Sequence, residues 1–222
     1  MAAVADVTTV LVVDDDPLVR SALTLMLGGD SRLSVVGEAP DGAAGLAAYR
    51  ELRPDVVLMD IRMPVLDGID ATRALKDADH PPQVIVLTTF DADEHVLQAL
   101  AAGADGFLLK DTPPAEIVAA IRAVAAGEPM LSPSATRAVL SRIRESSPDG
   151  RGDDARRALD GLTDRERDVA LEVGRGHSNA EIAHRLHLSV PTVKAHVSRL
   201  FDKLQVTNRV QIAIVVHDAG LA

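Results

Sequence analysis

Residues 10–19 read VLVVDDDPLV, in which four apolar residues run directly into Asp14, Asp15 and Asp16. A short continuous apolar run of this kind is typical of a buried strand. Three adjacent carboxylates repel one another, and this costs free energy unless they are solvated or hold a cation. The stretch therefore predicts a buried strand that ends either in a solvated turn or in a cation site.

Four more apolar runs follow at similar intervals, with helical patterns between them. Continuous apolar strands alternating with helices are typical of a parallel sheet covered on both faces. We therefore expect an α/β fold with a five-stranded, doubly wound parallel sheet. The expected strands are Val7–Val13, Leu33–Val36, Asp55–Met59, Gln83–Thr88 and Gly106–Leu109, and the expected helices are Pro17–Leu27, Gly42–Leu52, Ile69–Ala78, Asp93–Ala102 and Pro114–Ala126.

The chain is expected to divide into an α/β domain (1–131), a linker (132–158) and a helical domain (159–222). Within the linker, 134–144 could form a helix, whereas 145–158 is polar and broken by Pro and Gly, as flexible linkers are. Beyond residue 159, strand patterns are replaced by closely spaced helix starts, two of them with the spacing of a capping box. We expect a small all-α domain of four short helices.

Charge is distributed unevenly between these parts. Residues 1–131 carry 9 Lys/Arg and 21 Asp/Glu, a net charge of −12, whereas residues 132–222 carry 14 and 12, a net charge of +2. Residues 182–217 hold five basic residues against Asp202 alone, which predicts a basic patch on an acidic protein. The chain has no Cys, no basic leader sequence and no apolar run long enough for a membrane span, so we expect a cytoplasmic protein that does not enter the membrane.

Polar residues stand where the expected strands end. Because the carboxyl ends of parallel strands share one edge of the sheet, these side chains should converge there. Carboxylates are suitable ligands for Mg²⁺, and an Asp beside such an ion can attack phosphorus. A hydroxyl and an ammonium group would bind the phosphoryl oxygens. The residues are Asp14 and Asp15 after the first strand, Asp60 after the third, Thr88 and Thr89 after the fourth, and Lys110 after the fifth.

Four motifs, VVDDDPLVR (12–20), VVLMDIRMPVLDGI (56–69), VIVLTTF (84–90) and AAGADGFLLKD (101–111), resemble the receiver domain of bacterial two-component response regulators. The resemblance covers about residues 8–131 and implies the flavodoxin-like receiver fold. It implies that Asp60 accepts a phosphoryl group from a sensor histidine kinase, and that Thr88 and Lys110 contact that group. It also implies a Mg²⁺ site made by Asp14, Asp15, Asp60 and the backbone carbonyl of Arg62.

Three residues depart from the common receiver pattern. Phe107 stands where many receivers have a Tyr that is coupled to the switch Thr, here Thr88. Thr89 replaces a smaller residue. Asp111 follows Lys110 where many receivers have Pro, and a cis bond before Asp would cost about 2.5 to 4 kcal/mol. We therefore expect an altered loop or a strained peptide between Lys110 and Asp111.

In the helical part, SVPTVKAHVSRLFDKLQ (189–205) places its apolar residues on one stripe and leaves polar and basic side chains outward. With the helix Asn179–Leu186 before it, this segment forms an expected helix-turn-helix. The stretch LTDRERDVALEVGRGHSNAEIAHRLHLSVPTVKAHVSRLFDKLQV (162–206) resembles the LuxR/NarL-type DNA-binding domain. The resemblance implies that the recognition helix enters the major groove. The expected DNA-binding residues are Thr192, Lys194, Ala195, Ser198, Arg199 and Lys203, of which Lys194, Ala195 and Ser198 would meet bases.

Three further expectations concern this domain. Many relatives have a basic residue at the position of Ser198, so a base contact or some affinity could be lost here. His184 and His187 lack the spacing of an HExxH zinc motif, so we expect no zinc. The last helix, 208–221, is apolar on more than one face. Its β-branched residues also fit a strand, which is the alternative. As a helix, it would leave an apolar face for a dimer contact.

The sequence as a whole predicts a transcriptional regulator, not an enzyme, that binds double-stranded DNA as a homodimer after phosphorylation at Asp60. Two alternatives stay open. One is a phosphatase of the haloacid dehalogenase type that uses Asp14 as its nucleophile, since Asp14-Asp15-Asp16 contains an Asp-x-Asp after an apolar strand. The other is a DNA-binding protein that a ligand or partner protein controls without phosphate.

Overall fold

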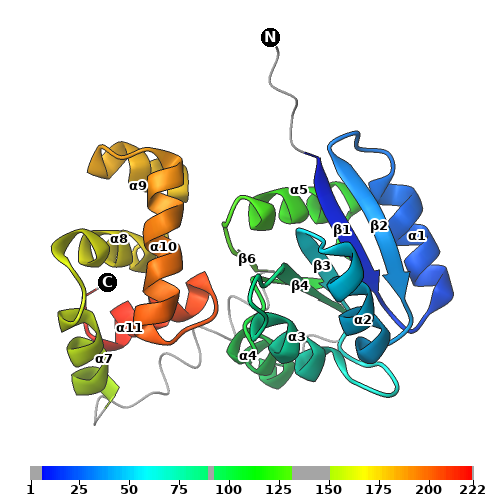
Figure 1. Cartoon of the computed structure of the whole chain (residues 1–222), viewed down its shortest axis with the longest axis horizontal. Coiled ribbons are helices and arrows are strands. Elements are labelled where there is room, and N and C mark those ends of the chain that lie inside the picture. Colours follow the sequence, from blue (N-terminus) through cyan, green and yellow to red (C-terminus); the bar gives the residue numbers. More distant parts are fainter. Residues whose placement is uncertain (1–6, 90–92, 132–150, 222) are drawn as a thin grey trace. The chain divides into compact units, whose positions relative to one another are not determined.

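The computed structural model describes residues 7–89, 93–131 and 151–221 and divides into an N-terminal α/β unit and a C-terminal helical unit (Figure 1). The sheet of the α/β unit has the strand order β2-β1-β3-β4-β5-β6, and all of its pairs are parallel. The strands are β1 (Thr8–Val13), β2 (Leu33–Ala39), β3 (Val56–Met59), β4 (Gln83–Thr88), β5 (Gly106–Leu109) and β6 (Met130–Leu131).

Helices cover both faces of this sheet, as the continuous apolar strands predict. On one face, α1 and α5 pack against side chains such as Val10 and Val12, and on the other α2 and α3 pack against Leu11 and Val13 (Figure 1). The doubly wound α/β fold is therefore confirmed. The helices are α1 (Pro17–Leu27), α2 (Gly42–Leu52), α3 (Gly68–Lys76), α4 (Asp93–Ala101) and α5 (Pro114–Ala125).

The expected count of five strands is wrong by one. Met130–Leu131 adds a sixth strand at the sheet edge, in register with Gly106 and Phe107 of β5. Two residues are too few to show a strand period in the sequence, and Pro129 and Pro133 on either side indicate only a helix stop.

The helical unit contains five helices in the part of the chain that the structure describes, one more than expected. The additional helix, α7 (Arg151–Asp160), lies in the segment that we expected to be a flexible linker. Ala155 and Leu159 on α7 are buried in the core of the unit, and this packing favours a helix despite the polar composition. The segment 134–144 lies outside the described residues. The other helices are α8 (Asp164–Gly174), α9 (Asn179–Leu186), α10 (Val190–Leu204) and α11 (Arg209–Asp218).

Two smaller expectations also have outcomes. The last segment is a helix, α11, rather than a strand. Every peptide bond in the described residues is trans, so the peptide between Lys110 and Asp111 is trans as well. Across residues 7–89, 93–131 and 151–221, no helix combines the length and apolar character needed to cross a membrane.

Candidate functional site

The acidic group expected at the carboxyl edge of the sheet is present. Asp14, Asp15 and Asp60 each offer one oxygen, and these oxygens lie within 4.8 Å of one another. Asp14 and Asp60 are buried and Asp15 is exposed. Asp16 does not join them, because its side chain caps α1 by accepting a hydrogen bond from the Leu18 N–H. The triplet of acids therefore divides into two candidate metal ligands and one helix cap.

The backbone around Asp14 is fixed on several sides. Its Oδ1 accepts a hydrogen bond from the Asp16 N–H at 3.0 Å, and its carbonyl oxygen accepts one from Nη1 of Arg20 at 2.7 Å. Arg20 also pairs with Glu38 at 3.4 Å, so its charge is balanced on the far side. This role of Arg20 was not predicted from the sequence. Its place in the second turn of α1 brings it close to Asp14, but this is evident only once the fold is known.

Lys110, at the end of β5, bridges the two buried acids. Its Nζ lies 2.6 Å from Oδ2 of Asp14 and 3.2 Å from Oδ2 of Asp60. Burial raises the pKa of Asp60, Lys110 opposes this rise, and the nearby Asp14 adds to it. Burial lowers the pKa of Lys110, but the two carboxylates outweigh burial and raise it overall. The site thus holds more negative charge than the one ammonium group neutralises, which favours a bound cation.

The remaining candidates lie around this edge. Thr88 is buried at the end of β4, and the side chain of Phe107 is fully buried in β5. Arg62 is exposed in the loop after Asp60, and this loop must pass close to the sheet. A Cβ at Gly68 would stand 1.8 Å from the carbonyl oxygen of Asp60, so only glycine fits there. The loop that carries Asp60 and Arg62 is therefore closely packed at its base.

In the helical unit, α9 and α10 form the expected helix-turn-helix. Ser189 caps α10 by accepting a hydrogen bond from the Thr192 N–H at 3.2 Å. One face of α10 is buried, and the other carries most of the residues expected to meet DNA. The buried residues are Val193, Val197, Leu200 and Leu204, and the exposed ones are Thr192, Lys194, Ala195, Ser198 and Arg199.

Lys203 differs from those residues because it has a partner inside the unit. Its Nζ lies 2.7 Å from Oε2 of Glu166, the capping-box glutamate at the start of α8. The same oxygen accepts hydrogen bonds from the N–H and the hydroxyl group of Thr163. Hydrogen bonds from Lys203 and then from Thr163 lower the pKa of Glu166 to about 2.

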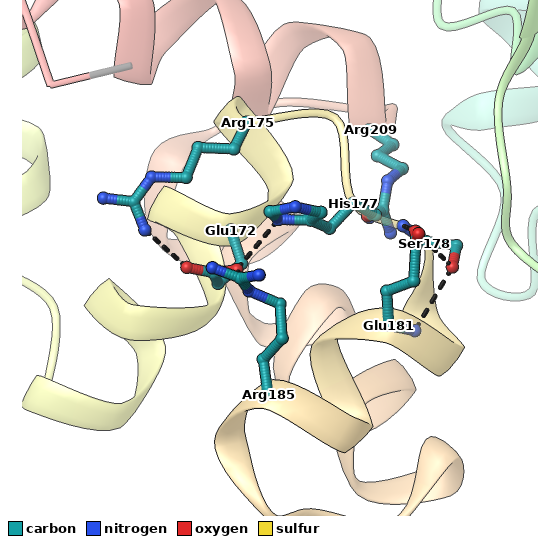
Figure 2. Close-up of polar contacts among 7 residues, drawn as sticks. All are labelled: Glu172, Arg175, His177, Ser178, Glu181, Arg185 and Arg209. Atoms are coloured by element: carbon teal, nitrogen blue, oxygen red, sulfur yellow. Dashed lines mark hydrogen bonds and ion pairs between the residues drawn. The ribbon is translucent and has the colours of Figure 1, made fainter.

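A second glutamate on α8, Glu172, collects three basic side chains at the other end of that helix (Figure 2). Its oxygens lie 2.5 Å from Nη1 of Arg175, 2.6 Å from Nε of Arg185 and 2.8 Å from Nδ1 of His177. Burial favours a higher pKa for Glu172, but the hydrogen bonds from Arg175 and Arg185 outweigh it and lower the pKa. Glu172 therefore joins α8 to α9 and to the turn between them.

Arg209, which belongs to the basic residues counted in the sequence, is buried. Its guanidinium donates one hydrogen bond to the backbone oxygen of His177 (Figure 2). It donates another to Oδ1 of Asn179 at 2.7 Å. Burial lowers its pKa. Arg185, Lys203 and Arg209 thus all have partners within the unit, and none of these contacts was predicted from the sequence.

A cluster of carboxylates that could hold a metal ion, at the edge of a doubly wound sheet, together with a helix-turn-helix unit, is typical of DNA-binding regulators with a receiver domain. Residues 10–122 match the family model for the response regulator receiver domain, and residues 160–216 match that for bacterial regulatory proteins of the luxR family. The chain belongs to the two-component response regulators with a LuxR-type DNA-binding domain.

Individual relatives agree over nearly the whole length. The transcriptional regulatory protein LiaR of Bacillus subtilis (strain 168) is 38% identical over 208 residues, which is 94% of this chain and 96% of LiaR. The response regulator protein VraR of Staphylococcus aureus (strain Mu3 / ATCC 700698) is 36% identical over 96% of this chain and 97% of VraR. The crystal structure of the response regulator ChrA, from a heme-sensing two-component system, matches with a TM-score of 0.53 and 33% identity over 98% of this chain and all of that one.

Proposed function

We propose that Asp60 accepts a phosphoryl group from a partner sensor histidine kinase and that this event controls DNA binding by the helical unit. The observation that carries the proposal is the position of Asp60. Its carboxylate shares the ammonium group of Lys110 with Asp14 and lies within one group of three acids. A buried acid beside two others and one cation matches what a phosphoryl acceptor with a metal needs.

The donor set fits Mg²⁺, which prefers one or two carboxylates together with waters and phosphate oxygens. Asp14, Asp15 and Asp60, with the backbone carbonyl of Arg62, would hold the ion. When bound, it would neutralise charge on the oxygens of the phosphoryl group.

The step itself uses few groups of the chain. One oxygen of Asp60 attacks the phosphorus, and the bond from phosphorus to the donor histidine nitrogen breaks with its electron pair passing to that nitrogen. Lys110 would then bind a phosphoryl oxygen in place of Asp60, and the hydroxyl group of Thr88 would donate to another. The protein is a phosphoacceptor here, with at most self-phosphorylation and self-dephosphorylation activity.

The added charge would shift a conformational equilibrium of the receiver. Thr88 and Phe107 are the proposed switch, with Thr88 drawn toward the phosphate and the surface near Phe107 repacked. The output is a homodimer that binds promoter DNA in the cytoplasm. Ala213 and Ile214 on α11 are only half-buried, which supports a dimer contact there. The proposed DNA-contacting residues are Thr192, Lys194, Ala195, Ser198 and Arg199.

The test is the intact mass of the purified protein after incubation with Mg²⁺ and acetyl phosphate, for the wild type and for Asp60→Asn. The proposal expects one acid-stable, base-labile phosphoryl adduct on the wild type and none on the variant. An adduct that persists in Asp60→Asn would favour Asp14 as the nucleophile. No adduct on either protein would favour control by a ligand or partner protein.

A further inference from the structure

Lys203 lies on the same helix as the proposed DNA-contacting residues, yet its charge is used inside the helical unit. Its Nζ completes a set of three donors around one oxygen of Glu166, the other two coming from Thr163. The carboxylate of Glu166 is 5% exposed, whereas the side chain of Lys203 is 41% exposed. A carboxylate this deeply buried is destabilised when it loses its donors, whereas the exposed ammonium group can return to water. The pair therefore matters more to Glu166 than to Lys203.

The two residues come from opposite ends of neighbouring helices. Glu166 is in the first turn of α8, and Lys203 is in the last turn of α10. An ion pair between them fixes the end of the recognition helix against the start of α8. A lysine that is already paired with a carboxylate adds no net charge to the protein surface, so it displaces few counterions from DNA.

We propose that Lys203 is a positioning residue of the recognition helix, which acts on DNA binding through Glu166 and not by contacting a phosphate. This inference rests on the proposed DNA interface on α10. It assigns the phosphate contacts of α10 to other residues, above all to Arg199, which is exposed and has no ion pair among the described residues.

The other end of α8 is built in the same way. Glu172 pairs with Arg185 of α9 (Figure 2). The two buried glutamates of α8 therefore hold both helices of the helix-turn-helix. This repetition on an independent pair supports a positioning role for Lys203. We therefore expect that Arg185, like Lys203, does not contact a DNA phosphate.

The test measures how DNA affinity depends on salt, using the full-length protein after incubation with Mg²⁺ and acetyl phosphate. The DNA is a duplex of about 30 base pairs that the wild type, treated in the same way, selects from a random-sequence pool. Each phosphate contact contributes about 0.9 to the slope of log K against log salt concentration. Arg199→Met, the control four residues away on α10, should reduce the slope by about this amount per bound protomer. Lys203→Met should weaken binding by roughly twofold to fivefold with an unchanged slope, as a lost partly exposed pair would.

Glu166→Gln tests the pair from its other side. Gln still serves in a capping box, so this variant removes the charge and keeps the helix cap. It should weaken DNA binding about as much as Lys203→Met, and the double variant should be no weaker than either single one. The melting temperature should show the same lack of additivity without any DNA.

Two results would overturn the inference: a slope that falls in Lys203→Met as it does in Arg199→Met, or tighter DNA binding by Glu166→Gln, which would mean that Glu166 withholds a phosphate ligand. Failure of the proposed DNA binding gives a different result. In that case the wild type selects no duplex at all, and the inference falls with the DNA interface on which it rests.

Discussion

Buried carboxylates occur in both units of this protein, but their pKa values are shifted in opposite directions in the two units. Asp60 in the receiver is 6% exposed, and Glu166 and Glu172 in the helical unit are 4% and 6% exposed. Despite this similar burial, the pKa of Asp60 is raised, whereas the pKa of Glu166 falls to about 2 and that of Glu172 is also lowered. Burial and the neighbouring Asp14 raise the pKa of Asp60 by more than Lys110 offsets. Several hydrogen-bond donors instead lower the pKa of each glutamate.

The receiver leaves its acids short of positive charge. One ammonium group serves Asp14 and Asp60 together, so the site can take up a cation or a phosphoryl group. In the helical unit, Glu172 alone faces the guanidinium groups of Arg175 and Arg185 and the imidazole of His177, so its negative charge is already balanced. Substitutions at these acids should accordingly change stability in opposite directions.

The largest effect is expected for Glu172→Ala, which removes the shared partner of Arg175, Arg185 and His177. Breaking a fully buried pair costs about 3 to 5 kcal/mol. Because Arg175 and Arg185 are 48% and 51% exposed and regain water, we expect a loss of about 2 kcal/mol in the free energy of unfolding of the helical unit. Urea unfolding followed by circular dichroism measures it. The control is Glu181→Ala in the neighbouring capping box, and a loss no greater than that of the control would contradict the role of Glu172.

Mg²⁺ should stabilise the receiver and leave the stability of the helical unit unchanged. At a free concentration ten times its dissociation constant, the ion stabilises the form that binds it by about 1.4 kcal/mol. We expect this gain for the receiver transition in scanning calorimetry and no shift in the helical transition. Asp15→Asn is the matched control because it removes an exposed ligand without disturbing the core. Equal shifts of both transitions would show that Mg²⁺ acts on the protein in general and not at the acidic group.

Asp60→Asn should stabilise the receiver when Mg²⁺ is removed. The raised pKa of Asp60 means that the folded state disfavours its charged form, so replacing it with a neutral side chain relieves that cost. Chemical denaturation with and without EDTA measures the difference between the variant and the wild type. A destabilised variant in EDTA would mean that the pair with Lys110 outweighs the repulsion from Asp14.

The sequence was sufficient to predict most of the fold and the receiver acids. Strand ends mark positions on one edge of a parallel sheet, so Asp14, Asp15, Asp60 and Lys110 could be brought together without coordinates. The short edge strand Met130–Leu131 and the helix α7 could not, since the first is too short to have a period and the second depends on the burial of Leu159.

The structural ion pairs were missed for a different reason. The spacing of Thr163 and Glu166 correctly predicts a capping box, but it says nothing of a second partner on another helix. Glu166 and Lys203 are 37 residues apart, and Glu172 and Arg185 are 13 apart. From the sequence, Lys203 is therefore predicted to bind DNA, and Arg185 is counted only in the basic patch. Such pairs depend on how helices pack, which no local pattern records.

The smallest effect on stability near neutral pH is expected for the ion pair of Glu166, and it is detected by its loss at acidic pH. A pKa of about 2 in the folded state, against an ordinary value of 4.5, means that the unfolded state binds the proton more readily. The stabilisation is thus complete above pH 4.5 and is lost as the pH falls toward 2. Since Lys203 is 41% exposed, we expect it to be below about 1 kcal/mol.

Urea midpoints of the helical unit, measured for the wild type and for Glu166→Gln at about pH 6 and about pH 3, test this. The wild type should be the more stable at the higher pH, and the difference should shrink at the lower one. Asp60 behaves in the opposite way, because its raised pKa makes protonation favour the folded receiver, so Asp60→Asn should lose its advantage in acid. A difference for Glu166→Gln that does not change with pH would show that Lys203 does not hold the charge of Glu166, and the contrast between the two kinds of buried acid would then rest on Glu172 alone.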